Sequence, residues 1–165
     1  MKKLDLAAIP TESGCNYPAP FDAPCLGSSW KRLGQAGGLR NIGVNISRLP
    51  PGVWSSQRHW HSHEEELIYI LEGEATLVTD EGEEPMGPGD CAVFPAGDPD
   101  GHHLINRSDR DVVLLEVGTR EPERDRCVYP DIDMIAIPGV RPYVRRDGTP
   151  YPAKDATTWL VGQAP

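Results

Sequence analysis

The chain has 165 residues, 25 acidic and 16 basic side chains, and a formal net charge of −9. This length suits one well-buried domain and is short for two. The negative charge argues against nucleic acid and anionic membranes as partners, and no apolar run reaches the length of a membrane span.

The beginning of the chain is predicted to be irregular. The chain has a basic start, but Asp5 interrupts any apolar core after it, so we expect no secretory signal and a cytoplasmic protein. Four prolines within residues 1–38 exclude long helices and central strands from an N-terminal arm. The four cysteines form no Cys-x-x-Cys pair and are expected to be reduced thiols, although a Cys15–Cys25 bridge stays open.

Residues 39–118 carry short strand patterns separated by glycine and proline. The first has Ile42, Val44 and Ile46 alternating with polar residues, and it ends at a Pro-Pro-Gly turn. Further strands are expected around His59 and His61 and at 67–71, 74–79, 91–94, 102–106 and 111–117. Evenly spaced short strands favour an all-β barrel or double sheet. Residues 119–165 are predicted to be a tail that packs on this core or on a partner subunit, with short strands at most.

His59, His61, Glu66 and His102 are the candidate metal ligands. Alternate residues of a strand point to the same face, so the first two imidazoles can lie side by side. Together with a carboxylate they suit a first-row divalent ion and leave coordination positions open. Periodicity alone leaves Glu65 open as a substitute for Glu66, and these residues could instead be polar groups on a solvated strand.

Two blocks of the sequence resemble the paired motifs of the cupin superfamily. The first block is Gly52, His59-x-His61, Glu66 and Gly73; the second is Gly89, Pro95-x-Gly97, His102 and Asn106. The gaps before His59 and before His102 are longer than in the family motifs, which changes loop length more than ligand geometry. Both blocks fall within residues 39–118, and their joint occurrence is far more specific than a lone His-x-His.

The resemblance implies a fold and a ligand set. The fold is an antiparallel jelly-roll barrel, or double-stranded β-helix, with an irregular N-terminal arm and C-terminal tail. The implied ligands of a divalent ion (Fe, Mn, Zn, Ni or Co) are His59, His61, Glu66 and His102. His102 is favoured over His103 because of its spacing to Asn106. Small cupins also commonly dimerise, so a homodimer is predicted.

The same resemblance suggests a metal-dependent enzyme that acts on a small oxygen-rich substrate, similar to sugar-phosphate-isomerase-like cupins. A phosphate would need cations, for which Arg48 and Arg58 are candidates, although either could be an ordinary exposed arginine. No residue clearly supplies a general base: Tyr69 and Glu65 are candidates, but sheet packing or solvent exposure explains each equally well. The alternatives are a non-haem iron dioxygenase or lyase, and a non-catalytic cupin that binds a small molecule.

Overall fold

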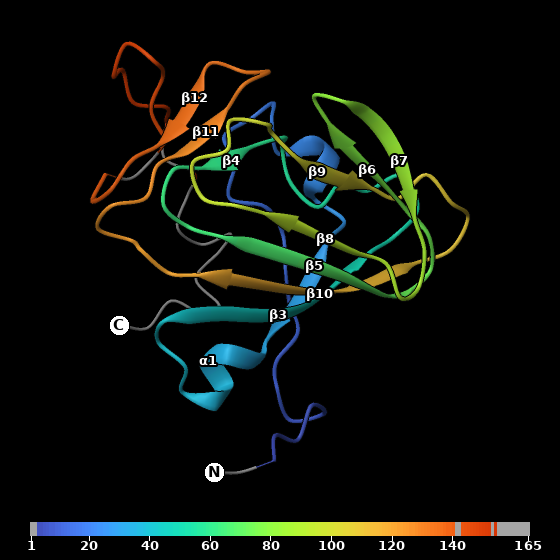
Figure 1. Ribbon diagram of the computed structural model, residues 1–165. Helices are drawn as coiled ribbons and strands as arrows, with labels where there is room; N and C mark the ends of the chain where they lie inside the picture. The colour runs from blue at the N-terminus through green and yellow to red at the C-terminus, as the bar shows by residue number, and fades with distance from the viewer. Residues whose placement is uncertain (1–2, 141–142, 153, 155–165) are drawn as a thin grey trace.

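The computed structural model describes residues 3–140, 143–152 and 154, and antiparallel strands form two facing layers (Figure 1). The larger sheet has six strands in spatial order: β1 (Glu12–Ser13), β2 (Ser29–Arg32), β3 (Ile42–Leu49), β10 (Val112–Thr119), β5 (Glu66–Glu72) and β8 (Cys91–Phe94). We call this sheet the lower layer, following Figure 1. The predicted all-β jelly-roll fold is confirmed.

The upper layer consists of two three-stranded sheets that meet edge to edge. One holds β7 (Gly82–Met86), β6 (Ala75–Thr79) and β9 (His103–Ile105), and the other holds β12 (Met134–Ala136), β11 (Cys127–Tyr129) and β4 (Trp60–His61). Antiparallel bridges between His59 and His102 and between Trp54 and Ile105 join them. The segment that carries two predicted ligands is therefore tied to the segment that carries a third.

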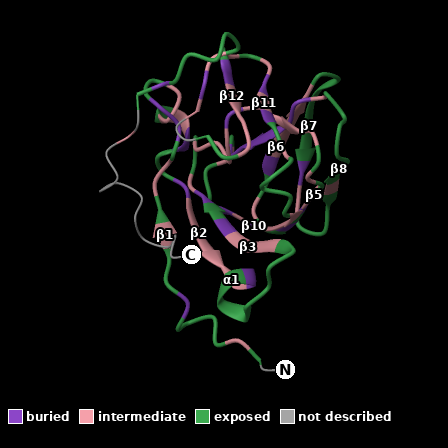
Figure 2. Cartoon of the chain, turned by 90° about the vertical axis from the view of Figure 1, so that its left-hand side faces the viewer, coloured by how far each residue is buried: buried purple, intermediate pink, exposed green. Residues whose placement is uncertain are grey.

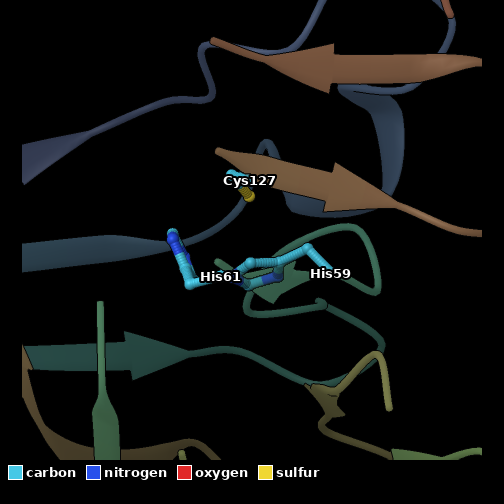
Figure 3. Close-up of side chains that lie close together, drawn as sticks. All are labelled: His59, His61 and Cys127. Atoms are coloured by element: carbon cyan, nitrogen blue, oxygen red, sulfur yellow. The ribbon is translucent and has the colours of Figure 1, made fainter. Parts of the chain in front are cut away.

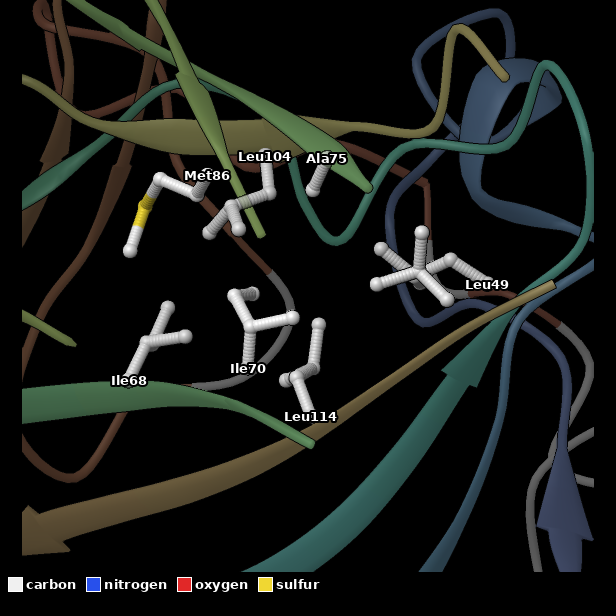
Figure 4. Packing of buried hydrophobic residues seen from close by; sticks show 8 residues of the cluster. Leu49, Ile68, Ile70, Ala75, Met86, Leu104 and Leu114 are labelled. Carbon is white, nitrogen blue, oxygen red and sulfur yellow. The ribbon is translucent and has the colours of Figure 1, made fainter. Parts of the chain in front are cut away.

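The hydrophobic core fills the space between the layers at one end of the barrel (Figure 4). In β5, Ile68 and Ile70 are buried, whereas Tyr69 and Leu71 on the alternate face are exposed. The alternation follows from the two-residue period of a strand with one face in the core. The core cluster comprises Leu49, Ile68, Ile70, Ala75, Met86, Leu104, Val112 and Leu114.

The N-terminal arm is more regular than predicted. β2 pairs with β3 over four residues, and β1 adds outside β2 (Figure 2). The arm also contains a 3-10 turn, η1 (Ala23–Cys25), and a short helix, α1 (Leu33–Gly37). The prolines lie outside both strands, so they limit where the arm pairs without preventing it from extending the sheet.

Strand β7 was not predicted, because Glu83, Glu84 and Pro85 are poor strand formers. It lies at the edge of its sheet, where a proline need not donate to a neighbour and charged side chains can face water. Of its five residues only Met86 is buried. An edge position therefore explains a strand without the expected alternation.

The arm and the tail pack together beside the upper layer. A second buried cluster joins Tyr17 and Cys25 of the arm to Cys127, Tyr129, Met134 and Tyr151. The described part of the tail forms the short strands β11 and β12. All four cysteines are free thiols. Among the described residues, no helix has the length and apolarity needed to cross a membrane.

Candidate metal centre

Strand pairing brings the three predicted histidines to one face of the upper layer. His59 and His102 form a bridged pair, in which each backbone N–H donates to the other residue's carbonyl, at 3.1 and 2.8 Å. His61 lies two residues after His59, so both side chains point to the same face. Glu66 begins β5 in the lower layer. Three imidazoles from one layer thus face one carboxylate from the other.

Three imidazoles converge on one carboxylate oxygen of Glu66. Glu66 Oε2 lies 3.0 Å from His102 Nε2, 3.5 Å from His59 Nε2 and 3.6 Å from His61 Nε2. The structure therefore brings together all four residues that the sequence singled out. Glu65, the alternative to Glu66, lies just before β5 and is exposed.

Hydrogen bonds fix the tautomers of two of the imidazoles. His61 Nδ1–H donates to Asp125 Oδ2 at 2.6 Å, and His59 Nδ1–H donates to the Gln57 carbonyl at 2.9 Å. A carbonyl oxygen and an ionised carboxylate only accept hydrogen bonds, so each Nδ1 carries a hydrogen. Each ring then turns its Nε2 towards Glu66, as a hydrogen-bond donor when the ring is protonated and as a metal-binding lone pair when the ring is neutral. In histidines that ligate metals, the ring nitrogen that does not bind the metal typically donates such a hydrogen bond.

The third imidazole is held by stacking. The His102 ring lies parallel to the Phe94 ring, with centroids 3.5 Å apart and an interplanar angle of 4°. Within the described part of the chain, its Nδ1 has no hydrogen-bond partner. Phe94 comes from β8, directly opposite Glu66 in the strand register, so the same pair of strands positions the carboxylate and the ring under His102.

Charge in the centre favours an ionised carboxylate. Burial alone would raise the pKa of Glu66, but hydrogen bonds from His102 and His59 outweigh it and hold that pKa well below its usual range. Burial lowers the pKa of His102, which favours its neutral form. Neutral imidazoles and a carboxylate are the donors that Fe, Mn, Co, Ni and Zn accept. The arrangement could therefore hold a divalent metal ion.

His103 is buried but faces away from the centre. Its Nδ1 donates to the Ser56 carbonyl at 2.9 Å, and its ring meets the Trp54 ring edge-on. Neighbouring strand residues point to opposite faces, which separates His103 from His102. The predicted preference for His102 agrees with this placement.

The structure does not bring Arg48 or Arg58 to the candidate centre. Arg48 is exposed and pairs with Asp111 at 2.6 Å. Arg58 forms two hydrogen bonds of 2.7 Å with Asp131 and a further ion pair with Asp80. In the described part of the chain, neither arginine lines either of the two cavities that include His102. Aspartates distant in sequence engage both guanidinium groups, and contact of these arginines with a substrate stays a prediction.

A cavity of about 320 Å³ adjoins the centre. His59, Glu66 and His102 line one side of it. The rest of the lining includes Tyr17, Asn45, Ser55, Ser56, Glu64, Glu116, Thr119 and Arg120. These groups offer hydrogen bonds to a small polar molecule placed against the candidate ligands.

Glu116, on β10, is a functional candidate that the sequence interpretation missed. Its carboxylate accepts a hydrogen bond of 2.8 Å from the Ser47 hydroxyl. Burial raises the pKa of Glu116, and the nearby charge of Glu66 adds to the rise. The signal was present in the sequence, because Glu116 is in phase with the inward-facing Val112 and Leu114 of a predicted core strand.

Arg120 supplies a cation where the sequence had suggested Arg48 and Arg58. It is exposed and lines the cavity. Its guanidinium lies beside Gly43, about 3.5 Å from the position that a Cβ on this glycine would occupy. Within residues 3–140, 143–152 and 154 it forms no ion pair. By contrast, a second cavity of about 560 Å³ reaches His102 from the side of β7 and β8 and has an acidic lining: Glu81, Glu83, Glu84, Asp98 and Asp100.

Residues 45–118, which contain all four convergent side chains, match the family model of the cupin domain. A crystal structure of a sugar phosphate isomerase of the cupin superfamily from Silicibacter pomeroyi is 46% identical, with a TM-score of 0.86. The match covers 92% of this chain and 98% of that one. The chain belongs to the cupin superfamily.

Other solved structures share the cupin's fold. One from Acidithiobacillus ferrooxidans, whose name also refers to a sugar phosphate isomerase, is 29% identical over 77% of this chain and 81% of that one, with a TM-score of 0.67. The polyketide cyclase RemF from Streptomyces resistomycificus is 22% identical over 73% and 80% of the two chains, with a TM-score of 0.59, and supports the fold alone. No curated protein matches the chain significantly.

Proposed function

We propose that this cupin binds a divalent metal ion through His59, His61, Glu66 and His102 and isomerises a small sugar or sugar phosphate by proton transfer. One observation carries the proposal: a second, raised-pKa carboxyl group, Glu116, lines the same cavity as the convergent metal donors. The two relatives whose names refer to sugar phosphate isomerases support the substrate class.

The two carboxyl groups suit different tasks. Glu66 is held in its ionised form by the imidazoles, which suits a metal ligand. A bound divalent ion would supply Lewis-acid polarisation of substrate oxygens. Glu116 would take a proton from one carbon of the substrate and return it to the neighbouring carbon. Its raised pKa suits that exchange at neutral pH better than an ordinary carboxylate does.

Arg120 would bind the anionic end of the substrate. It lies on the cavity that Glu116 lines, and the described residues provide no carboxylate that pairs with it. The acidic side chains around the second cavity would repel a phosphate there. A phosphorylated sugar would therefore approach the centre from the Arg120 side, with its hydroxyl groups towards His59 and Glu66.

The first test is metal content, measured by elemental analysis of protein purified without added metal. The wild type should carry a divalent ion, and the double variant His59→Ala, His61→Ala should lose it. An unchanged metal content in the double variant would overturn the site assignment. Asp111→Asn, at an exposed ion pair, is the matched control and should retain the metal.

The second test is solvent exchange during turnover of sugar phosphates in D₂O, followed by NMR. Glu116→Gln should keep its metal but lose deuterium incorporation and turnover by about 10²–10⁴-fold. The exposed Glu72→Gln should leave both unchanged. Bound iron with substrate-dependent oxygen uptake would favour a dioxygenase instead. Full metal loading without turnover or exchange would favour a binding cupin.

A further inference from the structure

We propose that the thiol of Cys127 is an additional donor to the metal ion, approaching it from the β11 side of the centre. This inference rests on the metal binding in the proposed function. It adds a sulfur ligand to the set of three imidazoles and one carboxylate, and it concerns a residue that belongs to neither motif of the sequence.

Strand register places Cys127 beside the imidazoles. In the pairing of β11 with β4, Cys127 stands directly opposite His61, and Val128 stands opposite Trp60. Side chains directly opposite each other in an antiparallel pair project to the same face, with Cβ atoms about 4.5–5.5 Å apart. His59 lies two residues before His61 and shares that face. Cys127 is therefore on the inner face of the upper layer, with the candidate ligands.

The donor atoms are close enough to share an ion. One sulfur and one ring nitrogen from each of His59 and His61 all lie within 4.8 Å of one another. Figure 3 shows the sulfur of Cys127 extending from β11 towards the two imidazole rings of the β4 segment. His59 thus belongs to two groups of donors, one with His61 and Cys127 and one with Glu66 and His102, whereas the second group of His61 is with Glu64 and Asp125.

The surroundings of the thiol exclude competing roles that need solvent access. Cys127 is 7% exposed and belongs to the buried cluster that includes Tyr17 and Tyr129. A divalent ion at this position would displace the thiol proton, which passes to water, and form a metal–thiolate bond. A sulfur donor makes the site softer, so it would favour cobalt or zinc over manganese.

Cobalt(II) tests the proposal, because a cobalt–thiolate bond gives a charge-transfer absorption in the near ultraviolet that nitrogen and oxygen ligands lack. Metal-free protein is loaded with one equivalent of cobalt, and binding is measured separately by equilibrium dialysis. We expect the band in the wild type and in the triple variant Cys15→Ser, Cys25→Ser, Cys91→Ser. We expect its loss in Cys127→Ser and Cys127→Ala, with cobalt still bound.

The wild-type spectrum alone can overturn the inference, so the test does not depend on how well the variants fold. One bound cobalt without the charge-transfer band would exclude Cys127 as a ligand and leave the proposed function standing. A band that survives in Cys127→Ser would place the sulfur ligand elsewhere. Cobalt binding that is absent, or unchanged in the His59→Ala, His61→Ala variant, would overturn the proposed function as well.

Discussion

At the scale of single residues, Asp125 orients the candidate centre without being one of its four convergent residues. Besides the hydrogen bond from His61, its other oxygen accepts the backbone N–H groups of His63 and Glu64, at 2.9 and 3.2 Å. Burial alone would raise the pKa of Asp125, but these hydrogen bonds outweigh it and lower that pKa. The carboxylate is thus kept ionised and aimed at His61.

Replacing this carboxylate by an amide should weaken metal binding. In Asp125→Asn, the amide can present either its oxygen or its nitrogen to His61, so the tautomer that frees Nε2 is no longer enforced. We expect metal affinity to fall about 10–100-fold, as is typical when the partner of a ligating histidine is lost. Isothermal titration with zinc would measure this. An affinity equal to that of the Asp111→Asn control would show that Asp125 plays no such part.

Glu116 should reduce the stability of the metal-free protein at neutral pH. Its pKa is raised in the folded state, so the folded protein holds this proton more tightly than the unfolded chain does. The stability associated with the neutral carboxyl group is present below the ordinary pKa of about 4.3. It is lost as pH rises through the folded pKa, which lies higher.

Glu116→Gln should therefore raise the thermal unfolding midpoint at pH 7 more than at pH 4, because the amide carries no charge at either pH. Unfolding followed by circular dichroism at both pH values, on metal-free protein, measures the difference. The exposed Glu72→Gln is the control and should shift neither midpoint. An equal shift of Glu116→Gln at the two pH values would contradict the raised pKa.

The four convergent residues were predictable from the sequence, but the residues that support them were only partly so. The motif spacings selected His59, His61, Glu66 and His102, and strand alternation was consistent with Glu66. Asp125 gave no signal, because it reaches His61 across 64 positions through a loop in a charged segment. The partner of Arg58 gave no signal for the same reason, since Asp131 is 73 positions away.

At the scale of elements, the turn between β5 and β6 depends on Gly73. Its φ of 80° lies in the left-handed region, and a Cβ there would stand 2.4 Å from the Asp111 carbonyl oxygen. Gly52 has the same φ of 80° but no atom within 4 Å of its would-be Cβ. The two glycines therefore separate the cost of backbone strain from the cost of a steric clash.

Gly52→Ala should lower the free energy of unfolding by about 1–2 kcal/mol, which is the cost of the left-handed conformation for an L-residue. Gly73→Ala should lower it by about 1–3 kcal/mol more, because the Asp111 backbone must also move. Urea unfolding of the two variants measures the difference. Equal losses would show that the turn adjusts without strain and that the close approach has little energetic weight.

The predictability of each element followed from its place in the barrel. Strands β5 and β10 have one face in the core, so their alternation is legible in the sequence. Strand β7 is an edge strand, and β2 is recruited by pairing with β3, so neither needs an apolar period of its own. The formation of such strands depends on the neighbouring strand with which they pair, and the local sequence does not indicate that neighbour.

At the scale of the whole molecule, the outer face of the lower layer is apolar. Val93 of β8 is 64% exposed, and Leu71 and Tyr69 of β5 are 39% and 38% exposed. They lie on adjacent strands, with Tyr69 opposite Cys91 and Leu67 opposite Val93. Exposed apolar side chains grouped on one sheet face are typical of an interaction surface. This surface supports the predicted homodimer, which stays a prediction.

Sedimentation equilibrium at micromolar concentration should give a mass of twice the 18.1 kDa of the chain. The double variant Leu71→Lys, Val93→Lys should sediment as a monomer, because burying two unpaired charges in a symmetric interface costs more than the apolar contacts return. Val140→Lys is the matched control: Val140 is 42% exposed but lies in the tail, outside this sheet face, so the dimer should persist. A wild type that sediments as a monomer would contradict the prediction. A double variant that still sediments as a dimer would show that the interface lies on another surface.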